Sequence, residues 1–284
     1  MAKLRINPPL KGRTYHFETA QDLIDVKEEQ ITNEVNLSNW KNIKTYSGEN
    51  WYGHGLKNHD MATEAISKGW KYGNKKVEEM TSQIKLPQLE SVKRRNVRGR
   101  EGDMLDIHKV NSGQLDRAWT ARKRTSKQTA KRFTITANIG ANSNVNSDVL
   151  FWRGVATCAL TNALVTAGHA VEVIAYTTNT ALTEKENQKS PYEMFHTIGI
   201  KSFTTPLNLA SLVASICMAG FFRTCIFKAW LTDPQKCRPG LGHATKNELP
   251  QEVLNRNGVI ISVPVRLKNS TDVERWLNET AREI

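Results

Sequence analysis

The sequence predicts an α/β protein with a mainly parallel sheet flanked by helices, preceded by a smaller N-terminal α+β region. Residues 133–138 alternate apolar and polar side chains and are rich in β-branched residues, which is typical of a strand. An apolar helical stripe follows over residues 148–164, and a second β-branched run begins at Val171. The order strand, helix, strand predicts a right-handed βαβ unit with two parallel strands.

Composition divides the 284 residues into three regions. Residues 1–92 mix short polar, aromatic and helical stretches, so we expect a small α+β region there. Residues 93–132 form a basic connecting segment whose apolar spacing suggests that it packs on the core. Residues 133–284 hold the α/β domain, and the chain is long enough to bury a large core.

Local patterns predict some elements of the N-terminal region. Thr19 and Asp22 have the spacing of a capping box, which predicts a helix that runs to about Ile31. Residues 61–70 read as a second amphipathic helix. Glycines interleave with aromatic residues between Trp40 and Gly55, which is typical of loops or short strands.

The C-terminal part continues the alternation of strands and helices. Residues 198–204 are compatible with a strand, and residues 207–218 and 221–231 with two apolar helices. The apolar run at 258–265 predicts a strand buried on both faces. A capping box at 271–274 predicts the start of a last helix.

The sequence does not favour export or a membrane span. Its N-terminus lacks the apolar stretch of a signal peptide, and its four cysteines form no CxxC pair. Residues 202–222 carry no charge, but Pro206 and Asn208 interrupt them, so we expect a buried helix there. We therefore expect a reduced cytoplasmic protein with no membrane contact.

The basic segment is the strongest functional signal in the chain. Forty Lys and Arg residues against twenty-eight Asp and Glu residues give a net charge of +12, and residues 93–132 alone contribute +9. Such a surplus favours polyanions such as nucleic acid, although a charge run is also compatible with a solvated face. The candidate phosphate-binding residues are Lys93, Arg94, Arg95, Arg98, Arg100, Arg117, Arg122, Lys123, Arg124, Lys127, Lys131 and Arg132.

Trp119 lies among these cations, between Arg117 and Arg122. An aromatic ring in a basic groove supplies a stacking face for a base, which is how single strands are held without sequence readout. The competing interpretation is a core tryptophan, because Leu115 precedes Trp119 at helical spacing.

No motif predicts catalysis or a cofactor. The seven histidines are scattered, and His54 and His59 have a loose metal-like spacing without cysteine partners. The sequence has neither a phosphate-binding loop nor a Gly-x-Ser-x-Gly nucleophile elbow. We therefore expect a non-enzymatic protein.

The βαβ pattern of residues 133–178 resembles the start of a von Willebrand factor A domain, most of all the version in cobaltochelatase CobT-like proteins. Gly102-Asp-Met-Leu-Asp-Ile is similar to the segment that precedes the domain in such proteins. The family's metal site begins with Asp-x-Ser-x-Ser, whereas residues 138–142 read Asn-Ile-Gly-Ala-Asn here. Without the carboxylate and both hydroxyls we expect no tightly bound metal. Asp148 is either a replacement ligand or a helix N-cap.

Residues 51–54, 64–70 and 150–156 are similar to phage proteins that carry a degenerate A-type domain. Among these the chain most resembles the single-stranded-DNA-binding factors that recruit the N4-type phage RNA polymerase II. The resemblance implies a role in phage transcription in the host cytoplasm, with single-stranded DNA and a phage RNA polymerase as partners.

The same fold family also implies a different class of function. A-type domains bind partner proteins through loops at the C-terminal edge of the sheet, and the chelatase versions work beside an AAA+ ATPase. On this alternative Asn138, Asn142 and Asn144 would face a protein partner, and the basic segment would be incidental.

Overall fold

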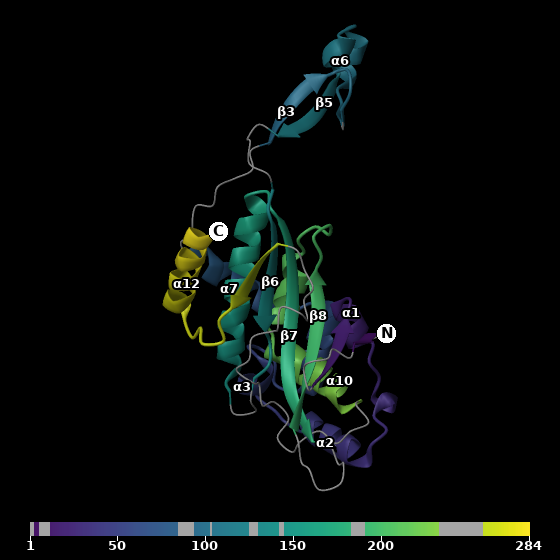
Figure 1. Cartoon of the computed structure of the whole chain (residues 1–284), viewed down its shortest axis with the longest axis vertical. Coiled ribbons are helices and arrows are strands. Elements are labelled where there is room, and N and C mark those ends of the chain that lie inside the picture. Colours follow the sequence, from purple (N-terminus) through teal and green to yellow (C-terminus); the bar gives the residue numbers. More distant parts are fainter. Residues whose placement is uncertain are drawn as a thin grey trace.

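A six-stranded mixed sheet forms the centre of the computed structural model (Figure 1). The strand order is β1-β2-β8-β7-β6-β9, and β2–β8, β7–β6 and β6–β9 pair in parallel. The strands are β1 (Lys3–Arg5), β2 (Gly12–Phe17), β6 (Arg132–Asn138), β7 (Ala170–Leu182), β8 (Pro191–Lys201) and β9 (Val259–Val263). The structure describes residues 3–5, 12–84, 94–102, 104–124, 130–141, 145–182, 191–232 and 258–284.

The predicted parallel core of the sheet is confirmed. Phe133 of β6 lies opposite Val171 of β7 on one side and Val259 of β9 on the other, and both pairings are parallel. Helix α7 (Ser147–Thr166) connects β6 to β7 and packs against both strands. The N-cap is Asn146 and not Asp148: the Asn146 side chain accepts a hydrogen bond from the Asp148 N–H at the start of the helix.

Strand β8 differs from the prediction in both length and direction. It begins at Pro191 and ends at Lys201, whereas we expected residues 198–204, and it pairs antiparallel with β7. Only residues 183–190 separate the two strands. This connection is too short for the crossover that a parallel pair requires. The sheet is therefore mixed and not wholly parallel.

The helices of the C-terminal part pack beside α7. Helices α8 (Leu209–Ile216) and α12 (Ser270–Glu283) both contact α7. Residues 219–231 form α9 (Ala219–Phe221), a π-helical turn (Phe222–Ile226) and α10 (Phe227–Leu231) where we expected one helix. The N-cap of α12 is Asn269, two residues before the predicted capping box. The segment from 233 to 257 lies outside the described residues.

The N-terminal residues share the sheet and the core with the rest of the chain. Strand β2 pairs with β8, and the helices pack mainly on α7, α8 and α9, so residues 12–84 do not form a region with its own core. Their helical elements are α1 (Ala20–Ile24), the 3-10 turn η1 (Glu28–Gln30), α2 (Glu34–Lys44), α3 (Glu49–Tyr52), α4 (His59–Lys68) and α5 (Lys71–Gln83).

Two predictions for this region need correction. The capping box at Thr19 and Asp22 is present, but its helix ends at Ile24 and not near Ile31. The aromatic stretch predicted as loops or strands contains helices α2 and α3. The Asn33 side chain caps α2, and the helix buries Trp40 in the core, so tertiary packing decides the conformation there.

The long apolar helix α7 has the length and composition of a membrane span, but about 67% of its apolar window is buried inside the fold. Helix α8 and the helical segment Ala219–Leu231 pass the same test only as a pair, and they are bent by 63° at their junction. Residues 202–222, the other apolar stretch in the sequence, include α8, which buries Leu212, Val213 and Ile216 in the core. Both features are therefore explained as core helices.

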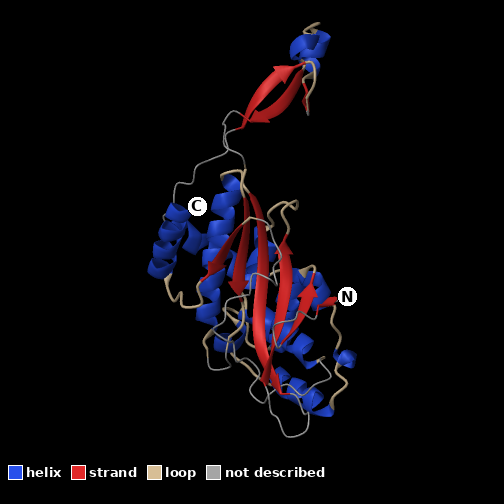
Figure 2. Cartoon of the chain, viewed as in Figure 1, coloured by secondary structure: helices blue, strands red, loops and turns tan. Residues whose placement is uncertain are grey.

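A second, three-stranded sheet projects beyond the end of the central sheet (Figures 1 and 2). It contains β3 (Arg94–Gly99), β4 (Met104–Leu105), α6 (Ile107–Asn111), the 3-10 turn η2 (Leu115–Arg117) and β5 (Trp119–Arg124). We call residues 94–124 the arm and the remainder the body. The arm does not pack on the core as we expected. Of its described side chains only Ala118 is buried, so it offers little apolar surface to bury against the body.

Candidate nucleic-acid interface

Backbone pairing between its strands holds the arm together, and a glycine allows two backbone segments of the arm to pack closely. Strands β3 and β5 pair antiparallel, with Arg98 opposite Thr120, and β4 adds to the other side of β5. A Cβ atom at Gly102 would lie 2.5 Å from the Thr120 carbonyl. Only glycine fits there without displacing the backbone, so Gly102 allows the chain to return toward β5.

Two aspartates, Asp106 and Asp116, stabilise the part of the arm that lies farthest from the body. The Asp106 backbone N–H donates to the Ala118 carbonyl at 2.7 Å, and its side chain caps α6. Asp116 forms an exposed ion pair with Arg100. Short-range hydrogen bonds and an ion pair therefore stabilise the fold of the arm. Most of its described side chains remain exposed or partly exposed.

The structure gathers most of the predicted phosphate-binding residues in the arm. Arg98, Arg100 and Arg117 are exposed. Arg94, Arg95, Arg122, Lys123 and Arg124 lie on β3 and β5, in the half of the arm near the body. Nine basic residues stand against Glu101, Asp106 and Asp116 in the described part of the arm. The arm therefore concentrates positive charge on a small structure.

Four of the predicted residues are not in the arm. Lys93 and Lys127 lie outside the described residues. Lys131 and Arg132 are exposed at the beginning of β6 on the body. Lys131 donates to the Ile284 carbonyl at 2.6 Å, and Arg132 lies 5.7 Å from the Phe203 ring centroid. These two residues make contacts on the body and lie apart from the arm.

Trp119 occupies the first position of β5. It lies opposite Gly99 of β3 and Leu105 of β4 in the two registers. Its side chain is partly exposed, and it belongs to none of the buried apolar clusters found among the described residues. Trp119 is therefore not a core residue of the body, and part of its surface is open to solvent.

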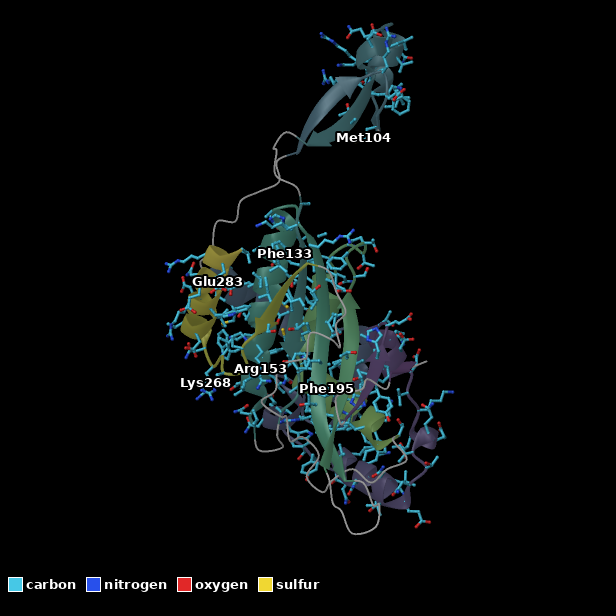
Figure 3. The ribbon with its side chains drawn as sticks, in the orientation of Figure 1. Met104, Phe133, Arg153, Phe195, Lys268 and Glu283 are labelled. Carbon is cyan, nitrogen blue, oxygen red and sulfur yellow. The ribbon has the colours of Figure 1, made fainter. Side chains whose placement is uncertain are left out.

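The loop after β6, where the A-type resemblance places a metal, is held by a buried arginine. Arg153 on α7 donates from Nη1 to the carbonyls of Asn138 at 3.1 Å and Gly140 at 2.9 Å, and from Nε to Val265 at 3.0 Å. Burial lowers the pKa of Arg153 to about 10, so the group stays protonated at neutral pH. Figure 3 shows Arg153 within the body.

These residues do not fit a divalent cation. The Asn138 side-chain oxygen accepts the Gly140 N–H at 2.8 Å, and the Arg153 guanidinium already places a positive charge at the end of the strand. Asp148 lies 3.0 Å from His54 Nε2, in an ion pair when the imidazole is protonated. In the described part of the loop, the Asn138 and Gly140 oxygen atoms therefore already accept hydrogen bonds, and a cation there would be repelled by the guanidinium.

The partner-binding residues predicted for this loop are not displayed together. Asn138 is buried, and its side chain bonds the backbone, so it does not face a partner as we expected. The reason is that β6 is covered on both faces up to its last residue. Asn142 and Asn144 lie outside the described residues.

A second buried arginine supports the same region and was not identified from the sequence. Arg223 in the π-helical turn donates from Nη2 to the Val145 carbonyl at 2.7 Å and from Nη1 to the Trp51 carbonyl. Its guanidinium stacks 4.1 Å from the Trp51 ring. A single charged residue within an apolar run, as at position 223, could have indicated a buried arginine with hydrogen-bond partners.

A cavity of about 780 Å³ lies between α1, the end of β8 and α8. Hydroxyl groups of Thr19, Ser202, Thr205 and Ser211 line it. Lys201 at its wall donates to the carbonyls of Val171 at 2.8 Å and Ser202 at 3.0 Å. Burial lowers the pKa of Lys201, but its ammonium group is occupied by these carbonyls.

Comparison with known families identifies the chain. The model of the Domain of unknown function (DUF7192) matches residues 6–280. The chain belongs to this family. No curated protein and no solved structure matches it. The DUF7192 match includes both the body and the arm, so the arm lies within the range that defines the family.

Among the described residues of this DUF7192 protein, no group of three or more His, Cys, Asp or Glu side chains is placed to hold a metal ion. His54 and His59, whose spacing suggested a metal site, instead contact Asp148 and Asp60. The arm is therefore the feature of the molecule that most needs a functional explanation.

Proposed function

We propose that this protein is a non-enzymatic nucleic-acid-binding protein that holds single-stranded DNA with its arm. The observation that carries the proposal is the concentration of cations on a sheet that projects from the body (Figure 2). A surface of this kind is accessible to a polyanion from several sides. It has no other evident use in folding, because it buries so little apolar surface.

The pairing of the arm strands supports a polyanionic ligand. Arg94 lies opposite Arg124, and Arg95 lies opposite Lys123. Like charges at directly opposed positions of an antiparallel pair are destabilising. Phosphate groups would remove this repulsion, and each contact would release condensed counterions.

The partly exposed Trp119 favours single strands. Base stacking on an aromatic ring needs an unpaired base, and the contact tolerates any sequence. Arg98 and Arg117, both exposed, lie on the same arm and would supply phosphate contacts.

The resemblance to phage proteins supplies the biological role in this proposal. In that role the protein recruits a phage RNA polymerase to single-stranded DNA in the host cytoplasm. The A-type identity of the body belongs to the same proposal. The parallel β6–α7–β7 unit supports it, since that unit begins an A-type domain.

A second candidate is a protein-interaction module that works beside an AAA+ ATPase. The observation in its favour is that Arg153 holds the Gly140 carbonyl and Arg223 holds the Val145 carbonyl near the C-terminal end of β6. Backbone positions held in this way at the edge of the sheet would lower the cost of ordering a surface for a partner protein. On this candidate the arm would not be required for binding.

The decisive experiment measures the affinity for a single-stranded oligonucleotide as a function of salt. Reversing charge at Arg94, Arg95, Arg122 and Arg124 should weaken binding to all sequences alike. Each phosphate contact contributes roughly −0.7 to the slope of log K against log salt, so four lost contacts should flatten the slope by about 3 units.

A matched control separates local contacts from total charge. Reversing the exposed lysines Lys41, Lys57, Lys71 and Lys75 changes the net charge equally, but on the body. This control should retain the wild-type slope. If instead the arm variant stays folded and binds with unchanged affinity and slope, the arm is not the site and the protein-interaction candidate replaces it.

A further inference from the structure

We propose that exposed apolar side chains of the arm insert between unpaired bases, so that the arm binds the bases as well as the phosphates. This inference rests on the proposed function and adds the part of the ligand that the arm recognises. The side chains are those of Met104, Leu105, Ile107 and Leu115, in the part of the chain between β3 and β5. Figure 3 shows Met104 on the arm, away from the labelled core residues Phe133 and Phe195.

The exposure of these residues is large and concentrated. Met104 is 71% exposed, Ile107 64% and Leu115 61%. Ten large hydrophobic residues are exposed in the described part of the chain, and the arm holds four of them within twelve positions. Single exposed apolar residues are ordinary, but a concentration of this kind on a small element indicates a binding surface.

The positive charge of the arm favours an anionic ligand for the apolar residues. Arg98 and Arg117 are exposed on the same arm, and the paired strands continue the positive charge toward the body. A second copy of the arm would be repelled by this charge. Unpaired nucleotides combine apolar base faces with an anionic backbone, so one ligand satisfies both features.

The chemistry of the side chains is suited to this contact. Leu, Ile and Met are among the apolar wedges that proteins insert between base steps, and unstacking is easiest where bases are already unpaired. Phosphates would follow the cationic strands β3 and β5 while bases reach Met104, Ile107 and Leu115 at the other part of the arm. The arm would then prefer strands with accessible bases to a bare sugar-phosphate backbone.

The test compares a thymidine strand of about 20 nucleotides with an abasic strand of equal length, which exceeds the usual site size of one binding module. These side chains should make the wild-type protein bind the thymidine strand about tenfold more tightly than base stacking on Trp119 alone would, the effect of burying one or two such side chains. The triple variant Met104→Ser, Ile107→Ser, Leu115→Ser should lose this tenfold part and keep the part of the preference that Trp119 supplies. Its affinity for the abasic strand and its salt slope should stay the same.

The control variant replaces exposed apolar residues of the body, Val35→Ser with Tyr72→Ser and Leu209→Ser, and should keep the full preference. A triple variant that keeps the whole preference, or equal binding of the two strands by the wild-type protein, would overturn this inference and leave phosphate binding by the arm standing. Binding of neither strand would remove the proposed function itself. In that case an acidic protein segment would become the ligand to test on the same surface.

A second measurement is independent of the folding of the variants. A strand that carries 2-aminopurine should become more fluorescent when the wild-type protein binds, because insertion separates the probe from its neighbours. Bound DNA with unchanged or lower fluorescence at every probe position would contradict insertion. If the salt slope of the triple variant is flattened, its arm is no longer folded. The fluorescence of the wild-type complex then decides whether the apolar side chains insert between bases.

Discussion

Arg94 lies directly opposite Arg124 where β3 and β5 pair, close to the point at which the arm leaves the body. Like charges at directly opposed positions of an antiparallel pair are generally destabilising, and no described acidic residue faces either position in the strand register. The register therefore predicts a local cost to the stability of the arm. A polyanion that binds across both strands would neutralise the facing charges, and the arginines would then contact its phosphates.

Trp119 gives the first prediction. Trp119→Ala should weaken binding to single-stranded DNA by about 1 to 3 kcal/mol while the salt slope stays nearly constant, because stacking involves no counterion release. Trp119→Phe should retain much of the affinity. Both variants are measured by fluorescence anisotropy at several salt concentrations, after thermal unfolding has shown that the body is intact. A change of slope equal to that of the charge variants would contradict a stacking role.

The second prediction concerns metal binding at the end of β6. The protein should show no Mg²⁺ or Mn²⁺ binding in the micromolar range by calorimetry, since Asn138 Oδ1 bonds Gly140 and the Arg153 guanidinium holds the adjacent carbonyls. Asn138→Asp restores the carboxylate of the A-type motif and serves as the comparison. Micromolar binding that disappears in Asn138→Ala would show that the loop is a metal site.

Arg153 should be essential for stability. Arg153→Met removes the donors for the carbonyls of Asn138, Gly140 and Val265 and leaves buried acceptors unpaired. We expect the free energy of unfolding to fall by about 2 to 4 kcal/mol in urea titrations. Arg275→Met, at an exposed position on α12, should change it by less than about 0.5 kcal/mol. Equal effects of the two substitutions would refute this role.

His196 predicts how stability depends on pH. It is fully buried and stacks on Tyr15 at 4.8 Å, and burial lowers its pKa to about 3. The unfolded chain binds a proton near pH 6.5, so the native state loses stability as the pH falls from about 6.5 toward 3. The slope reaches about 1.4 kcal/mol per pH unit. His196→Phe should remove this contribution.

The measurement is the difference in unfolding free energy between wild type and His196→Phe at pH 7, 5.5 and 4.5. The difference should shift in favour of the variant on acidification. Carboxylates elsewhere contribute equally to both proteins and cancel in the comparison. Parallel pH profiles would mean that His196 is not buried in its neutral form.

Several elements were predictable because short-range rules govern them. The alternation at 133–138 and the apolar run near Val259 fixed two strands, and both lie side by side in the sheet. The capping box at Thr19 began a helix as expected. The position of Gly168 after α7, with φ of 90°, follows from its tolerance of positive φ. Each of these depends on neighbours within a few residues.

The candidate interface was predictable in its charge and not in its shape. The basic composition of 93–132 located the segment, but its placement as an arm depends on how little of it can be buried. Met104 and Ile107 read as residues suited to packing, whereas the structure exposes them. Apolar residues seek burial only if a complementary surface is near, and no local pattern contains that information.

The α/β class, the central parallel strands, the long apolar helix and the basic segment could be predicted from the sequence, because periodicity and charge are local properties of the chain. The antiparallel direction of β8, the burial of Asn138 and the separation of the arm from the body could not. These features depend on which distant segments meet. Arg153 illustrates the difference, since its three carbonyl partners lie on two segments that the sequence separates by more than a hundred residues.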